Sequence, residues 1–183
     1  MNQLRRICLV GVRGVGKTTL IRSAIEELPN VDFIVGSSIL RELAGEAFAR
    51  FDHLPPEVKH GYREGVIDYM VDRQERDGRH ILCDGHTALL DESTGKVGPV
   101  FTEKDCRFYH ELILLEAPVE VLLDRRRNDT TKRRSTDLDV IAAEVAAERA
   151  TSRELADRWG MRLHHIPDNT GPHARAQLLE LLS

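Results

Sequence analysis

The eight residues Gly11-Val-Arg-Gly-Val-Gly-Lys-Thr18 combine three glycines, a lysine and a hydroxyl group at fixed spacing. Glycines at these positions let backbone N–H groups point toward an anion, and the lysine can bridge the β- and γ-phosphates of a nucleotide. Apolar residues 7–10 precede the segment and a helical pattern follows it, so the positive N-terminus of a helix also faces the phosphates. The spacing predicts a phosphate-binding loop for ATP, with Mg²⁺ held by the Thr18 hydroxyl. The residues assigned to ATP binding are Gly11, Val12, Arg13, Gly14, Val15, Gly16, Lys17, Thr18 and Thr19.

Asp84 is a second candidate functional residue, because it directly follows the apolar run 80–83. A parallel sheet presents ligand-binding groups at the carboxyl ends of its strands. Asp84 is therefore a candidate metal ligand together with Thr18, and a candidate catalytic carboxylate; the structural alternative is a turn-forming aspartate before Gly85. No glutamate follows Asp84 to polarise an attacking water, and the Asn-Lys-x-Asp guanine-binding motif is missing from the sequence. The pattern favours phosphoryl transfer over hydrolysis.

A basic segment follows the predicted helix 118–127, with six lysines and arginines among residues 124–134. Arginine forks can bind phosphate oxygens bidentately and stabilise the charge of a transferring phosphoryl group. The alternative is a solvated basic patch that touches RNA. A polar segment in this position is suited to fold over bound phosphates.

Residues 36–41 follow the second predicted strand and could receive a second substrate. Ser37 or Ser38 can cap the next helix, and Arg41 would project from its first turn toward an acceptor phosphate. The candidate acceptor-binding residues are Ser37, Ser38, Arg41, Arg50 and His86, with Arg63 in the same region.

Alternating apolar runs and helical patterns predict an α/β fold with a parallel sheet built from β-α-β units. The expected strands are 6–10, 31–35, 80–83, 111–115 and 161–166. The expected helices are 16–28, 39–50, 56–77, 118–127, 139–158 and 172–182. Segments 85–107 and 128–137 do not follow this alternation of strands and helices. Long polar insertions of this kind are usually binding loops or lids, and the alternative is a disordered surface loop. For 85–107 both alternatives stay open.

Composition sets broad limits on function. The 183 residues, 41% of them hydrophobic, are enough for one compact domain. A net charge of -4 argues against a general nucleic-acid-binding protein. The sequence has no apolar stretch of membrane-spanning length and no signal peptide pattern, which favours the cytoplasm. The three cysteines lack Cys-x-x-Cys spacing and are expected to be reduced structural thiols.

These segments together resemble the P-loop nucleoside-monophosphate kinases, and most closely the archaeal-type adenylate kinases, from about residue 6 to residue 166. The specific parts are the phosphate loop with Thr19, the strand ending Asp84-Gly-His86, and residues 125–134, which look like the short lid of the family. Residues 36–41 are similar to the entrance of the monophosphate site in adenylate kinases.

The resemblance implies a three-layer α/β/α P-loop NTPase fold with a five-stranded parallel sheet in the order 2-3-1-4-5, as one domain over residues 1–183. It also implies a helical acceptor-binding insertion at about 36–78 and an arginine-rich lid at about 125–137.

Individual roles follow from the same resemblance. Lys17 would stabilise the transferring phosphate, and Arg125 and Arg134 fall on lid arginines. Lys132 stands where the family tends to have another arginine, which keeps the charge but loses the planar fork.

The implied activity is an ATP-dependent kinase, with Mg²⁺ as cofactor, that phosphorylates a nucleoside monophosphate, foremost AMP. However, residues 94–102 replace the Gly-Tyr-Leu-Pro-Gly-Leu-Pro loop that archaeal-type adenylate kinases place near the acceptor. One alternative is a kinase for a hydroxyl acceptor such as a nucleoside, a polynucleotide 5′ end or another metabolite, for which Asp84 would serve as the base. Another is a nucleotide-responsive binding module that engages a protein or RNA partner without turnover.

Overall fold

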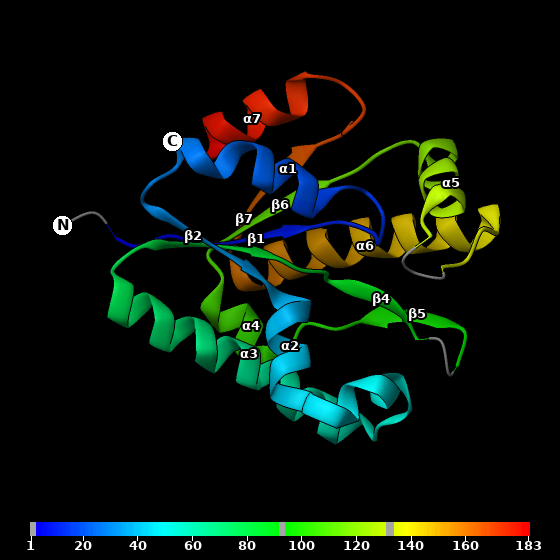
Figure 1. Cartoon of the computed structure of the whole chain (residues 1–183), viewed down its shortest axis with the longest axis horizontal. Helices are drawn as coiled ribbons and strands as arrows, with labels where there is room; N and C mark the ends of the chain where they lie inside the picture. The colour runs from blue at the N-terminus through cyan, green and yellow to red at the C-terminus, as the bar shows by residue number, and fades with distance from the viewer. Residues whose placement is uncertain (1–2, 92–93, 131–133) are drawn as a thin grey trace.

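The computed structural model describes residues 3–91, 94–130 and 134–183, and its centre is a five-stranded parallel sheet (Figure 1). The strands are β1 (Arg6–Val10), β2 (Val31–Val35), β3 (His80–Asp84), β6 (Glu111–Leu115) and β7 (Arg162–Ile166). Their order is β2-β3-β1-β6-β7, which confirms the predicted order 2-3-1-4-5. The first strand of the chain is therefore the central one, paired with β3 on one side and β6 on the other.

Helices cover both faces of the sheet. They are α1 (Lys17–Ala24), α2 (Gly36–Ala44), α3 (Pro56–Asp77), α4 (Glu103–Phe108), α5 (Val119–Asn128), α6 (Leu138–Trp159) and α7 (His173–Leu182). Two 3-10 helices, η1 (Ile25–Glu27) and η2 (Gly45–His53), extend α1 and α2. Figure 1 shows α1 and α7 on one face, and α3, α4 and α6 on the other. Among the helices of the described residues, none has the length and apolar character needed to cross a membrane.

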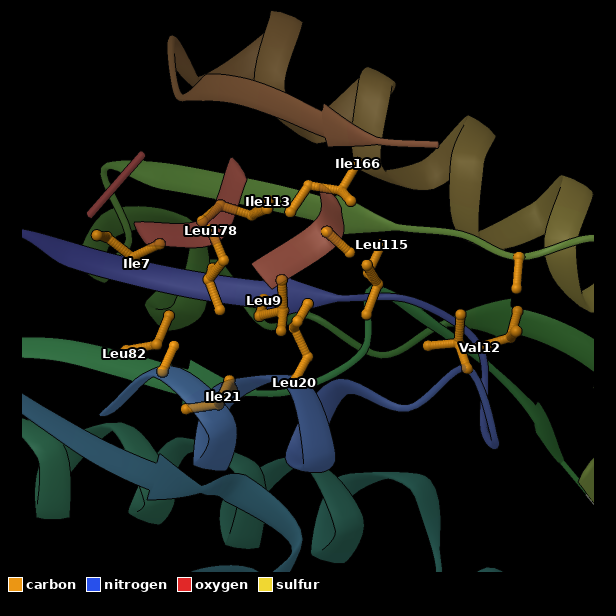
Figure 2. Packing of buried hydrophobic residues seen from close by; sticks show 14 of the residues in the cluster. Ile7, Leu9, Val12, Leu20, Ile21, Leu82, Ile113, Leu115, Ile166 and Leu178 are labelled. Carbon is orange, nitrogen blue, oxygen red and sulfur yellow. The ribbon is translucent and has the colours of Figure 1, made fainter. Parts of the chain in front are cut away.

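The period-2 alternation of β1 supplies both halves of the core, because successive side chains of a strand point to opposite faces. Ile7 and Leu9 pack with Leu20 and Ile21 of α1 and with Leu178 of α7, as Figure 2 shows. All five side chains are buried. Burying a leucine or isoleucine contributes about 1.5–3 kcal/mol relative to leaving it exposed, so this cluster fixes α1 against the sheet.

The intervening residues of β1 build the second half of the core. Cys8 and Val10 pack in a cluster that includes Met70 of α3, Phe108 of α4 and Ala156 of α6. The two clusters together hold the carboxyl end of β1, and the loop that follows it, in a fixed position between the helical layers.

Segment 85–107 is more ordered than the sequence analysis anticipated. It contains the antiparallel hairpin β4 (Ala88–Asp91) and β5 (Lys96–Pro99), followed by α4. The strands are only four residues long, and the hairpin lies against α6. α4 begins at a capping box in which the Thr102 hydroxyl accepts from the Asp105 N–H and the Asp105 carboxylate accepts from the Thr102 N–H. Neither short element carries enough periodicity to be found from sequence.

The helix after β2 also differs from its predicted limits of 39–50. α2 starts at Gly36 and ends at Ala44, and its C-cap Gly45 has a φ of +52°, which glycine adopts without strain. The chain then continues as the 3-10 helix η2. This bend decides where the arginines of the segment point.

Candidate functional site

The candidate site lies where the carboxyl ends of the central strands meet. Leu9 of β1 is in register with Asp84 of β3, and the Gly85 N–H donates to the Leu9 carbonyl at 3.1 Å. The loop that follows β1 therefore begins beside Asp84. This is the edge of a parallel sheet at which ligands bind.

Two glycines of the phosphate loop are required by close packing. A Cβ on Gly11 would lie 2.4 Å from the carbonyl oxygen of Leu115, and one on Gly16 would lie 2.7 Å from the Asn169 side-chain nitrogen. Gly16 also has φ +99°, and it is the N-cap residue from which α1 begins. These constraints fix the loop at the N-terminus of α1, where its N–H groups can meet an anion.

Lys17 is the first residue of α1 and is only 6% exposed. Its ammonium nitrogen lies 2.7 Å from the Gly11 carbonyl oxygen, 3.5 Å from His86 Nε2 and 3.7 Å from Asp84 Oδ1. Burial lowers the pKa of Lys17, and the negative charges of Asp84 and Glu148 oppose that shift. The structure thus brings Lys17, Asp84 and His86 together, three residues that the sequence analysis singled out.

Thr18 and Asp84 offer the two groups predicted for Mg²⁺. The Thr18 hydroxyl donates to Asp84 Oδ2, so a hydroxyl and a carboxylate lie side by side next to Lys17. Mg²⁺ is commonly held by one or two protein oxygens together with substrate phosphates and water. This pair fits such an ion if it arrives with a nucleotide.

His86 is the third group beside the lysine. Burial lowers the pKa of its imidazole well below the ordinary value, and the positive charges of Lys17 and Arg13 lower it further. His86 is therefore a neutral hydrogen-bonding group near neutral pH. Its Nδ1 atom is buried and has no hydrogen-bond partner in the described part of the chain.

A cavity of about 490 Å³ adjoins the phosphate loop on the side of α5, and we call it the donor-side cavity. Its lining includes Gly14 of the loop, Arg125 of α5 and Arg134. Arg125 donates to the Val15 carbonyl at 2.6 Å and to the Asn169 carbonyl at 3.1 Å, and Arg134 pairs with Asp129 at 2.5 Å. Arg125 thus lies on a helix and braces the loop, whereas Arg134 lies on the segment predicted as the lid.

Lys132, the other basic residue predicted for the lid, lies outside the described residues. The flanking chain places Arg134 next to the loop, since a Cβ on Gly14 would lie 3.8 Å from Arg134 Nη1.

A second cavity, of about 150 Å³, opens beside Asp84, and we call it the acceptor-side cavity. It is walled by the end of β3, by α2 and α3, and by the hairpin and α4. Its lining residues are Cys8, Gly36, Ser37, Leu40, Arg63, Val66, Cys83, Asp84, Gly85, His86, Leu89, Val100, Phe101, Asp105 and Tyr109. Segment 85–107, for which two interpretations were open, therefore forms a wall of this cavity.

The predicted acceptor residues divide into two groups. Ser37 and His86 line the acceptor-side cavity, whereas Ser38, Arg41 and Arg50 are exposed and are not among its lining residues. The Arg41 guanidinium lies 4.9 Å from the centre of the Phe48 ring, because the chain bends at Gly45 and brings η2 back against α2. Arg41 and Arg50 are thus not placed to bind an acceptor in this cavity.

Arg63 and Asp105 are the charged residues that α3 and α4 contribute to the cavity. Burial lowers the pKa of Arg63, and the nearby Asp105 carboxylate partly offsets the shift. Burial raises the pKa of Asp105, and hydrogen bonds from the Thr102 hydroxyl and N–H oppose it. Arg63 lies 5.9 Å from the Phe51 ring centre, so its guanidinium is steered by an aromatic face.

Comparisons with known proteins agree with this geometry. Residues 10–156 match a protein-family model described as AAA domain. The chain belongs to this AAA-domain family. The matched region runs from the end of β1 through most of α6, and so contains the phosphate loop, Asp84 and the basic segment. No curated protein matches the chain at a significant level.

Solved structures similar to this AAA-domain chain include two shikimate kinases and a chain of an RNA repair complex. Shikimate kinase from Acinetobacter baumannii, in complex with shikimate, has a TM-score of 0.63 and 20% identity, and the match covers 98% of this chain and 92% of that one. Shikimate kinase from Bacteroides thetaiotaomicron has a TM-score of 0.62 and 18% identity, with 98% and 99% covered. A chain of the Pnkp1/Rnl/Hen1 RNA repair complex has a TM-score of 0.57 and 14% identity, with 84% and 47% covered.

These similarities establish an α/β P-loop kinase fold. They give no support to a particular closeness to the archaeal-type adenylate kinases. The fold expectation is confirmed at the level of the P-loop kinases, and the acceptor is a separate question.

Two residues of the site carried no clear signal in the sequence. Asp105 belongs to a Thr-x-x-Asp capping pattern, which can be recognised but does not reveal a cavity. Glu148 is buried in the middle of α6 although a helical glutamate is ordinarily exposed. Glu144 and Ser152, four residues before and after it, are also buried, so the three residues lie on one face of α6. This spacing is the only sequence signal for the burial of Glu148.

Proposed function

We propose that the protein is an ATP-dependent phosphotransferase that moves the γ-phosphoryl group of Mg-ATP to a small acceptor. The observation that carries this proposal is the position of Lys17. The loop that bears it lines the donor-side cavity through Gly14, while its ammonium group contacts Asp84 and His86, which line the acceptor-side cavity. Phosphoryl transfer needs a positive charge placed between donor and acceptor, and catalysis in such sites is mainly positioning and electrostatics.

The residues of the chain have distinct tasks in this proposal. The loop N–H groups and Lys17 bind the β- and γ-phosphates, and Arg134 adds positive charge from the lid side. Thr18 and Asp84 would hold Mg²⁺, which when bound neutralises charge on the phosphates. The buried setting of Lys17 strengthens its attraction for the transferring group, because few water molecules screen it.

A small hydroxyl compound with one anionic group fits the acceptor-side cavity best. The Oδ1 atom of Asp84, 3.7 Å from the Lys17 ammonium nitrogen, can accept the proton of a hydroxyl group, while Oδ2 lies beside Thr18 for Mg²⁺. Arg63 faces the same cavity and is held by the Phe51 ring rather than by a hydrogen-bonded carboxylate of the described residues, so its guanidinium can bind an acceptor anion. The volume of about 150 Å³ favours a compact molecule.

AMP is the second candidate acceptor, and the same Arg63 favours it, since a guanidinium binds phosphate as well as carboxylate. The positions of Arg41 and Arg50 count against AMP, because they leave the cavity without further arginines among its lining residues. The carboxylates of Asp84 and Asp105 would also repel a phosphate dianion.

The test is phosphate transfer from γ-labelled Mg-ATP to a panel of acceptors. The panel contains shikimate and other hydroxy acids, nucleosides, AMP, CMP, GMP, UMP, dTMP and an RNA oligonucleotide with a free 5′ hydroxyl. Labelling of a hydroxy acid supports the proposal, and AMP-dependent ADP formation selects the second candidate. ATP binding without transfer to any acceptor would contradict a kinase and favour a nucleotide-responsive binding module.

Arg63→Gln should raise the KM for the acceptor about 10- to 100-fold, because a hydrogen bond to a charged group contributes about 1.5–3 kcal/mol. The KM for ATP should stay unchanged, since Arg63 does not line the donor-side cavity. Arg107→Gln is the matched control, because Arg107 is exposed on α4 and pairs with Glu103. Equal acceptor KM values for R63Q and R107Q would show that Arg63 does not bind the acceptor.

A further inference from the structure

A buried carboxylate of α6 joins two segments of the site that are far apart in the sequence. Glu148 is 1% exposed. Its Oε1 accepts from the Gly11 N–H and from the Thr87 N–H, both at 3.0 Å, and its Oε2 accepts from the Ala88 N–H at 2.8 Å. Gly11, the first residue of the phosphate loop, is thus hydrogen-bonded to the same side chain as Thr87 and Ala88, which we call the corner after His86.

The corner after His86 has additional links to α6. The Thr87 hydroxyl contacts the Glu148 carbonyl at 3.2 Å and the Ser152 hydroxyl at 2.9 Å. Thr87 and Ser152 are fully buried. The backbone of the corner is therefore held along one turn of the helix.

A second carboxylate, one turn earlier on α6, holds the other part of the loop. Glu144 pairs with Arg126 at 2.6 Å, and Arg126 donates to the Arg13 carbonyl at 3.0 and 3.3 Å. Both Glu144 and Arg126 are buried. α6 thus holds the loop at Gly11 directly and at Arg13 through Arg126.

Gly11 connects Glu148 to the reacting centre. Its N–H is fixed by Glu148, and its carbonyl accepts from the Lys17 ammonium group at 2.7 Å. Thr87 directly follows His86, which lies 3.5 Å from the same ammonium group. Glu148 lines neither the donor-side nor the acceptor-side cavity. It can act on catalysis through these two backbone segments and through its negative charge, which opposes the lowering of the pKa of Lys17 by burial.

The ionised form of Glu148 is the one that this geometry uses. All three of its partners are N–H donors, which favour a carboxylate. Burial raises the pKa of Glu148, and the hydrogen bonds from Thr87, Ala88 and Gly11 and the charge of Lys17 oppose the shift. A glutamine of nearly the same volume could accept at only one of the two oxygen positions, and its NH₂ group would face an N–H donor.

We infer that Glu148 is a positioning residue for phosphoryl transfer. By bonding Gly11, Thr87 and Ala88 with one carboxylate, it keeps the phosphate loop and the Asp84–His86 end of β3 at a fixed separation, so that Lys17, Asp84 and His86 meet at one point. The measured effect on turnover rests on the proposed function, whereas the hydrogen bonds can be tested without it.

The test compares Glu148→Gln with Ile141→Val. Ile141 is a fully buried core residue of the same helix with no polar contact to the site, and Ile→Val is a modest core truncation, so I141V controls for a weakened α6. E148Q should lower kcat about 10- to 100-fold, because a displacement of about 1 Å in a reacting group can cost that much. The KM for ATP should change less than about 3-fold. I141V should keep kcat within about 2-fold of wild type.

Backbone amide exchange provides the readout that does not depend on turnover. At least one of the Gly11, Thr87 and Ala88 amides should exchange at least about 10-fold faster in E148Q than in I141V, because glutamine keeps only one of the two acceptor oxygens. Glu148→Ala should lower kcat further than E148Q, since alanine retains no acceptor.

The outcomes separate this inference from the proposed function. If the wild-type protein transfers phosphate and E148Q has the kcat of I141V, Glu148 is merely structural and the inference is wrong. If the wild-type protein transfers phosphate to no acceptor, the proposed function fails. In that case equal amide exchange in E148Q and I141V would still overturn the inference. Selective loss of amide protection in E148Q would show that Glu148 does hold the phosphate loop and residues 87–88 together.

Discussion

The ammonium group of Lys17 lies among a carbonyl, an imidazole and a carboxylate, all within 3.7 Å. The bond to the Gly11 carbonyl is the shortest of the three, at 2.7 Å. The phosphate loop therefore holds its lysine in an internal position, ready for exchange onto phosphate oxygens that carry more negative charge than a carbonyl.

Lys17→Met tests this role with a side chain of similar length and no charge. We expect kcat to fall at least about 10²- to 10³-fold, the range seen when one preorganised electrostatic contact is removed from a transition state. Stability should also fall, because the buried carboxylates of Asp84 and Glu148 lose a neighbouring positive charge, although burial opposes the charged form of Lys17 and methionine fills the space. Turnover assays and thermal unfolding check the two expectations, and near wild-type turnover in K17M would refute the role of Lys17.

The phosphate loop and Asp84 could be predicted because their chemistry depends on residues that are neighbours in sequence or that end a strand. Arg41 could not be placed in the same way. Its surroundings depend on the bend at Gly45, which brings Phe48 of η2 under its guanidinium. The role of Glu148 could not be predicted from sequence either, because its partners Gly11 and Thr87 are 137 and 61 residues away along the chain.

At the scale of the elements, the site depends on short strands and a short helix that the hydrophobic periodicity of the sequence does not reveal. The hairpin β4–β5 and the six-residue helix α4 form one wall of the acceptor-side cavity, although strands of four residues and a helix of under two turns are weak signals. They are held by tertiary contacts with α6 and α3, and by the capping box of Thr102. The sheet and the long helices, in contrast, have enough length for their apolar patterns to be read directly.

Thr102→Val removes the hydroxyl cap of α4 while keeping the shape of the side chain. The expected loss of stability is about 1 kcal/mol, as for other N-cap substitutions. Because Asp105 loses a hydrogen-bond donor and lines the acceptor-side cavity, the KM for the acceptor should rise with little change in the KM for ATP. Urea unfolding and steady-state kinetics measure both effects. An unchanged urea midpoint would mean that the cap does not stabilise α4.

At the scale of the whole molecule, the opposite end of the sheet carries a second buried carboxylate with a different task. Glu111 is 1% exposed at the start of β6. Arg5 binds both of its oxygens at 2.8 and 3.0 Å, Arg162 binds at 2.8 Å and His164 lies at 3.2 Å. This network joins the residue before β1 to β6 and β7 at the amino ends of these strands, opposite the end that bears the phosphate loop.

Glu111 should make stability depend on acid pH. Burial alone would raise its pKa, but hydrogen bonds from Arg5 and His164 lower it to about 2. A carboxylate whose pKa is lower in the folded state stabilises the fold above its ordinary pKa of about 4.3, and this contribution is lost as the pH falls from there toward about 2. Glu111→Gln should therefore be less stable than wild type by about 1–3 kcal/mol at pH 7, discounted for the partly exposed arginines.

The measurement is urea unfolding of wild type and E111Q at several pH values between 7 and 2.5. The difference between the two proteins should shrink as the pH falls below about 5. Glu154→Gln, at an exposed position of α6, is the control and should differ little from wild type at any pH. A difference between E111Q and wild type that does not depend on pH would rule out this network as the source of acid sensitivity.

The bracing of the phosphate loop by Asn169 has a consequence for the order in which the protein acquires function during synthesis. The Asn169 side-chain nitrogen donates to the Val15 carbonyl at 2.7 Å. The backbone carbonyl of Asn169 accepts from Arg125, which also donates to the Val15 carbonyl. A ribosome completes Val15 of the phosphate loop 154 residues before it reaches Asn169, so the loop lacks this brace during that part of synthesis. A nascent chain halted after α6 would carry the entire loop sequence and still hold ATP less firmly than the finished protein.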